Sequence, residues 1–188
     1  MRKIILTVCL LLSLGAIRAE AFRINENRAS FAVGFGWRNK ERISNTVHFP
    51  TPNVLIERSV LPFKNFGFIS AGAQFGFHHG YHNARTPMVY KESWTSVYFI
   101  PRLALYFHEA FDEDDFPKNL DLYAGIGLGF NYLSHKLPEI FVDGDNTGFK
   151  FGYTVFAGAR YYFKPHAAAF AELGYGVTFL NAGITIRY

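Results

Sequence analysis

The stretch "LDLYAGIGLGFNY", residues 120–132, alternates apolar side chains with small or polar ones at almost every step. Its apolar positions are Leu120, Leu122, Ala124, Ile126, Leu128, Phe130 and Tyr132. The positions between them hold Asp121, Tyr123, Gly125, Gly127, Gly129 and Asn131. Consecutive side chains of a strand point to opposite faces of a sheet, so this period of two predicts a β-strand with two unlike faces.

The same alternation recurs along the chain in pieces of nine to fifteen residues, separated by stretches rich in Asn, Asp, Pro, Lys and His. Eight strands are predicted, at about 28–37, 53–61, 66–78, 94–108, 119–132, 149–163, 168–177 and 180–188. Long and short connections roughly alternate between them, which is typical of an up-and-down antiparallel sheet. We therefore expect an all-β fold, an eight-stranded antiparallel up-and-down barrel in which the last strand pairs with the first.

The composition of the two faces indicates which of them meets water. In a soluble barrel the less apolar face would lie outside and carry many Lys and Glu side chains. Here that face is mostly Gly, Ser, Thr and Asn, as in "FISAGAQFGFH" (residues 68–78). Small side chains suit the narrow interior of an eight-stranded barrel, which leaves the apolar face outside, where lipid accepts it. The barrel is therefore predicted to span a membrane, with aromatic girdles at the strand ends.

The first 21 residues have the layout of a secretory signal peptide. Arg2 and Lys3 precede an apolar run that is too short for a membrane-spanning helix, and the small-residue pattern of Ala19 and Ala21 follows. We expect residues 1–21 to be a signal peptide and residues 22–188 to be the barrel domain. Removing the signal takes away Cys9, which is the single cysteine, and leaves sixteen basic against fourteen acidic residues, a balance of +2. This near-neutral charge gives no reason to expect a nucleic-acid partner.

Three stretches carry a family resemblance: residues 120–132, "AGARYYF" (157–163) and "AFAELGYGVTFLNAGITIRY" (169–188). They resemble the small eight-stranded outer-membrane β-barrel family, with its OmpX-like and OmpA-barrel-like proteins, and more closely its Bacteroidetes-type members. The resemblance implies a place in the outer membrane of a Gram-negative bacterium, with both chain ends in the periplasm. The family includes adhesins, structural tethers and proteins without an assigned task, so the resemblance says little about function.

Five charged residues share the lumen-facing register of the predicted strands: Arg102, Asp121, Arg160, Glu172 and Arg187. Charges in a narrow interior are costly unless they are paired, so we expect a structural polar cluster that plugs the barrel. Arg160, on the preceding strand, is the first candidate partner of Glu172. Three arginines against two carboxylates leave room for water or an anion, and a selective pore lining is the alternative.

Other motifs are weaker. His78, His79 and His82 could bind Zn or Ni, but exposed histidines where a strand runs into a loop are the expected reading. The "DEDD" of residues 112–115 lacks the spacing of a Ca²⁺ loop, and the "GIGLG" of residues 125–129 has glycines at period two and no following helix. Ser134 and His135, with Glu139 nearby, are badly disposed for catalysis because neighbours on a strand face opposite ways. We expect no metal, no cofactor and no enzymatic activity.

The function expected is surface interaction, adhesion or envelope structure, carried by long outer loops at about 38–52, 79–93 and 133–148. A narrow channel is the first alternative and a lipid A-modifying enzyme the second. The partners expected are outer-membrane lipid and lipopolysaccharide, the outer-membrane assembly machinery and a cell-surface ligand of the loops, with the protein a monomer. Ile184, Ile186 and Tyr188 resemble the C-terminal signal that the assembly machinery recognises in this family.

Overall fold

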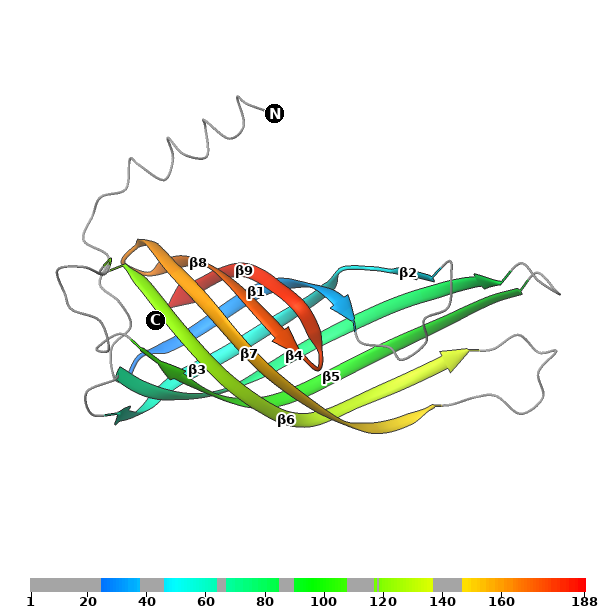
Figure 1. Ribbon diagram of the computed structural model, residues 1–188, viewed down its shortest axis with the longest axis horizontal. Helices are drawn as coiled ribbons and strands as arrows, with labels where there is room; N and C mark the ends of the chain where they lie inside the picture. Colours follow the sequence, from blue (N-terminus) through cyan, green and yellow to red (C-terminus); the bar gives the residue numbers. More distant parts are fainter. Residues whose placement is uncertain are drawn as a thin grey trace, which may run out of the picture.

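The computed structural model describes residues 25–37, 46–63, 67–84, 90–107, 117, 119–136 and 147–188, and these form a closed barrel (Figure 1). Its strands are β1 (Asn27–Trp37), β2 (Thr46–His48), β3 (Thr51–Phe63), β4 (Gly67–Ala84), β5 (Tyr90–Tyr106), β6 (Leu120–Lys136), β7 (Gly148–Lys164), β8 (Ala167–Tyr175) and β9 (Thr178–Arg187). All pairings are antiparallel, and β1 joins β9 as β4 joins β5, so the eight long strands close without an edge. The predicted fold class and the eight predicted strands are confirmed.

The pairing register gives the shear of the barrel. One circuit of paired positions that starts at Phe151 of β7 passes through Phe130, Phe99, Phe75, Val54, Phe31, Ile184, Ala169 and Tyr161. The circuit returns to β7 ten residues beyond its start. Eight strands with a shear of ten and ordinary spacings of ~3.3 Å along a strand and ~4.8 Å between strands tilt by about 40° to the barrel axis. Such a barrel is just wide enough for its own side chains.

The two faces of the sheet lie as the alternation predicts. Phe31, Phe75, Phe99, Phe130 and Phe151 are all more than half exposed on the outside. The interior holds Tyr98, Arg102, Tyr123 and Arg160, all buried. Val177 is an exception: the period of two would place it outward with Leu173 and Tyr175, but it is buried against Tyr98 and Ile100. It lies in the two-residue connection between β8 and β9, where the positive φ of Gly176 (+124°) turns the chain out of strand register.

The ends of the barrel differ. At the terminal end, where β1 begins and β9 ends, the Tyr188 amide donates to the Asn27 carbonyl (3.1 Å). At the opposite end, which we call the hairpin end, β4 to β7 run on past the ends of β1, β8 and β9 (Figure 1). Strand β2 pairs with the extended part of β4, at Gly80–His82, almost in line with β3.

The predicted outer loops are therefore shorter than expected. The pairing of β4 with β5 continues to Ala84 and Tyr90, and β6 extends to Lys136. Thr46–His48 is a strand within a predicted loop. The reason is physical: alternation in hydrophobicity ends where both faces of a strand are polar, whereas backbone pairing continues. The predicted signal peptide lies outside the described residues. No helix within the described residues is long and apolar enough to cross a membrane.

Candidate functional site: a charged lumen network

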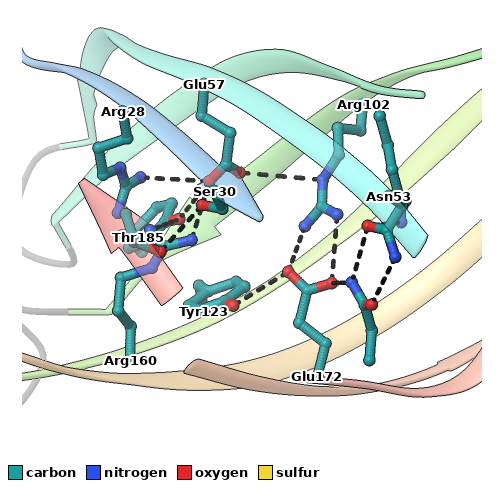
Figure 2. Close-up of polar contacts among 12 residues, drawn as sticks. Arg28, Ser30, Asn53, Glu57, Arg102, Tyr123, Arg160, Glu172 and Thr185 are labelled. Carbon is teal, nitrogen blue, oxygen red and sulfur yellow. Dashed lines mark hydrogen bonds and ion pairs between the residues drawn. The ribbon is translucent and has the colours of Figure 1, made fainter. Parts of the chain in front are cut away.

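Six charged side chains from six strands meet inside the barrel, and Figure 2 labels all of them except Asp121. We call them the lumen network: Arg28 of β1, Glu57 of β3, Arg102 of β5, Asp121 of β6, Arg160 of β7 and Glu172 of β8. Each is almost completely buried. Each lies at an inward-facing position of its strand. Because the strands close into a barrel, these inward-facing side chains meet. Three positive and three negative charges balance, which is the condition for burying them at all.

Arg102 and Glu172 form the tightest pair. The Arg102 guanidinium donates through Nη2 to Oε1 (2.7 Å) and through Nη1 to Oε2 (3.2 Å) of Glu172. The Tyr123 hydroxyl donates to the same Oε1 (3.0 Å), and the Phe156 ring lies 3.6 Å from the Arg102 carbon Cζ. A bidentate, charge-assisted pair of this kind holds both side chains in one orientation.

Glu57 is the hub of the network, because all three arginines approach it. Its nearest partner is Arg160, whose Nη2 donates to Oε2 (3.0 Å). Arg28 Nη2 lies 3.7 Å from Oε2, and Arg102 Nε lies 3.8 Å from Oε1. The Tyr106 hydroxyl accepts from Arg160 (2.9 Å) and donates to Glu57 (3.3 Å), so it links the two charges.

The terminal end of the lumen carries a second group of contacts. Arg28 Nη1 lies 3.7 Å from Asp121 Oδ2 and donates to the Tyr162 hydroxyl (3.4 Å). Arg187 pairs with Glu26 (3.3 Å), and both side chains are partly exposed at the rim. Arg187 is therefore a rim residue outside the buried network.

A layer of amides covers the network toward the hairpin end. Gln74 donates to Asn53 (3.0 Å), and Asn53 donates to Asn181 (2.9 Å), which in turn donates to Glu172 (3.4 Å). The cavity between the Arg102–Glu172 pair and these amides measures ≈10 Å³. It has room for about one water molecule. Beyond the amides, Tyr98, Ile100 and Val177 pack together as an apolar cluster.

The structure places four of the five predicted lumen residues in this network and Arg187 at its rim. The pairing of Arg160 with Glu172 is wrong: Arg160 bonds Glu57, and Glu172 bonds Arg102. Each carboxylate is held by the strand across the lumen rather than by its sequence neighbour. The expected excess of arginine is also wrong, because Arg28 and Glu57 complete a balanced set.

Sequence reasoning missed Arg28 and Glu57. Arg28 precedes the apolar Ala29 within a predicted strand, so the alternation could have predicted that Arg28 points into the lumen. Glu57 was harder, because the stretch 53–61 puts Leu55 inside and Arg58 outside, which blurs the alternation. Glu57 follows the polar residue Asn53 by four positions, so both side chains point to the same face of the strand. This even spacing could have identified Glu57 as a lumen residue.

The histidines do not lie in an exposed loop. His78 is a buried strand residue: its Nδ1 bonds the Thr51 hydroxyl (2.9 Å), and its Nε2 lies 3.4 Å from Nδ1 of His48. His79 faces outward and bonds Thr95 (3.1 Å). Among the described residues, no group of three or more His, Cys, Asp or Glu side chains could hold a metal ion.

The remaining motifs give no site. The "GIGLG" of residues 125–129 lies within strand β6, as predicted. Ser134 and His135 are consecutive in β6, and Glu139 lies outside the described residues, as does the "DEDD" of residues 112–115.

Among the comparisons with known proteins, one solved structure supports the fold. No protein-family model and no curated protein sequence matches the chain. The crystal structure of Ail, the attachment invasion locus protein of Yersinia pestis, matches 88% of this chain and 100% of its own, with a TM-score of 0.50 and 12% sequence identity. The N-terminal β-barrel domain of OprF from Pseudomonas aeruginosa matches 88% of this chain and 98% of its own (TM-score 0.46, 12% identity). The backbone structure of Yersinia pestis Ail in a phospholipid bilayer nanodisc matches 87% of this chain and 99% of its own, with a TM-score of 0.44 and 16% sequence identity.

At these identities the similarity is one of fold. The chain has the closed, all-antiparallel, eight-stranded architecture of a small outer-membrane β-barrel. A relation to Bacteroidetes-type members of that group stays a prediction.

Proposed function

We propose that the protein is an integral outer-membrane barrel, related to the OmpX-like and Ail-like proteins and exported through the signal peptide at residues 1–21. The support is its outer wall. Phe149 (78% exposed), Phe151 (66%) and Phe31 (61%) belong to a continuous apolar surface around the barrel. Soluble proteins rarely expose apolar patches beyond a few hundred Å², because water disfavours them.

We further propose that the barrel is a non-enzymatic surface protein, which acts through the sheet at its hairpin end in adhesion, cell-surface interaction or envelope structure. One observation carries this: β4 and β5 stay paired from Phe77 and Val97, where the apolar wall ends, to Ala84 and Tyr90. A paired sheet presents a fixed surface, whereas a long loop must be ordered when it binds.

The outward face of that sheet carries rings suited to recognition. Phe49, which is half exposed, packs against His79 (ring centroids 5.7 Å apart) and Tyr81 (6.0 Å). Aromatic side chains supply large contact areas and are enriched at protein interfaces. The similar protein Ail is named for attachment and invasion, which agrees with a contact role for this end of the barrel.

Trimming the hairpin tests this role. Residues 81–93 are replaced by Asn-Gly, a favoured two-residue hairpin turn, which keeps the pair Gly80–Trp94. We expect attachment of expressing bacteria to cultured epithelial cells to fall to the level of the empty vector. The matched control replaces Pro165 and His166 by Asn-Gly at the opposite end of the barrel, and attachment should persist. Attachment that survives the hairpin trimming would contradict the surface role.

The lumen network is proposed to act as a structural plug. Its support is the balanced set of buried ion pairs and the amide layer, between which only about one water fits. A narrow channel is the alternative. The outer-membrane assembly machinery is proposed to recognise Ile184 and Ile186, exposed on the outward face of β9, and Tyr188, which is exposed just after β9. Membrane lipid and lipopolysaccharide are the proposed surroundings of the monomer.

Conductance in a planar bilayer distinguishes the plug from the channel. The folded wild-type protein should give no single-channel steps. Arg102→Ala should give them, because it leaves Glu172 without its bidentate partner and opens space beside the ≈10 Å³ cavity. Lys150→Ala, an exposed charge at the hairpin end, is the control and should stay silent. Robust conductance by the wild type would contradict the plug.

A further inference from the structure

A hollow with a volume of ≈460 Å³ lies in the outer wall across the neighbouring strands β9, β1, β3 and β4. We call it the phenylalanine groove. The residues that shape it are Phe31, Val33, Val54, Phe75, Phe77 and Ala182. All six lie on the outward face, whereas Asn53, which also borders the groove, turns its side chain to the amide layer of the lumen.

The groove arises from a break in a row of large side chains. The circuit of paired positions that begins at Phe151 carries phenylalanine at five of its first six places, and Val54 is the exception. Phe31 and Phe75 stand on either side of Val54 as walls. Val33 and Ala182, which are paired across β1 and β9, line the groove in the next outward row. The lining is almost entirely apolar, because its polar residue, Asn53, directs its side chain to Asn181 in the lumen.

The groove runs from the hairpin end into the apolar wall, the direction that an acyl chain takes below a lipid headgroup. At the hairpin end it stops at Phe77, and the next outward residue of β4, His79, bonds Thr95. That bond is the first polar pair on the outward face of β4 and β5 beyond Phe77 and Val97. At the other end the groove reaches Ile184, deeper in the apolar wall. If one methylene group takes as much room as one water molecule in the liquid, ~30 Å³, the groove would hold on the order of fifteen methylene groups.

We propose that the phenylalanine groove is a binding site for one unbranched acyl chain of a membrane lipid, which stays with the barrel when other lipids exchange. This proposal rests on the proposed membrane location. In a bilayer the chain is already out of water, so close packing against the phenylalanine walls is what would hold it. A methyl-branched chain would lose part of that contact.

Native mass spectrometry tests the proposal. The protein is folded into dimyristoylphosphatidylcholine vesicles, extracted in a mild detergent and ejected from the micelle. The wild type should carry one lipid per chain. Ala182→Phe and Val54→Phe each put a ring into the groove and should lower the lipid-bound fraction at least tenfold. The matched control is Ala157→Phe, an exposed outward position of β7 outside the groove, and it should keep the lipid. Vesicles of diphytanoylphosphatidylcholine, with branched chains, should give little bound lipid.

The outcomes separate this proposal from the membrane location. A folded, inserted wild type that carries no lipid, or groove variants that carry as much lipid as the control, would overturn the groove and leave the location intact. A dimer peak that disappears in the groove variants would overturn it in favour of a second chain as occupant. A protein that does not fold into vesicles at all would overturn the membrane location itself and the groove with it.

Discussion

At the scale of the residue, Glu57 decides the state of the lumen. It is approached by Arg28, Arg102 and Arg160, and it bonds the last of these directly at 3.0 Å. Removing one member of a buried ion network leaves an uncompensated charge, which costs more than the network contributes as a whole. Of the two side chains that sequence reasoning missed, Glu57 is therefore the one on which the interior depends most.

Neutralising Glu57 should destabilise the barrel. Glu57→Gln leaves three buried arginines facing two carboxylates, and we expect the free energy of unfolding in lipid vesicles to fall by about 3–5 kcal/mol. Urea titration of the inserted protein measures it. Glu26→Gln, at the partly exposed rim pair with Arg187, is the control and should cost only about 0–1 kcal/mol. Equal losses in the two variants would show that Glu57 is not the hub.

At the scale of the element, the sequence predicted every long strand but not where strands end or how they turn. Period-two alternation persists as long as one face meets an apolar environment, so it located β6 and its neighbours. It could not follow β4 from His78 to Ala84, where backbone pairing continues without an apolar face. It also could not place Val177, because one left-handed residue, Gly176, decides which way that side chain points.

The connection between β8 and β9 should tolerate no side chain at Gly176. Its φ of +124° disfavours one, and a Cβ there would lie 1.8 Å from the Tyr153 carbonyl oxygen, which is backbone and has little room to move. Gly176→Ala should lower the free energy of unfolding by roughly 1–3 kcal/mol. Gly148→Ala is the control, since a Cβ there would meet nothing within 4 Å. Equal urea midpoints for the two variants would contradict this account of the turn.

At the scale of the whole molecule, eight strands and a shear of ten explain why the candidate site could be predicted only in part. The alternation of each strand showed which residues point inward, so Arg102, Asp121, Arg160 and Glu172 could be assigned to one interior. Which arginine meets which carboxylate depends on strand tilt and on contacts across the lumen, and neither can be read from a single strand. Which residues line the interior was thus predictable, whereas which arginine pairs with which carboxylate was not.

The same geometry places the charged side chains inside the barrel and the phenylalanines on its outer surface, which is the reverse of a soluble protein. Electrophoretic mobility of the membrane fraction tests this arrangement most directly. The protein should remain with the membranes after an alkaline wash and, once extracted in detergent, should migrate as a compact species before boiling and as an unfolded one after it. A protein that appears in the soluble fraction, with the same mobility before and after boiling, would contradict the account.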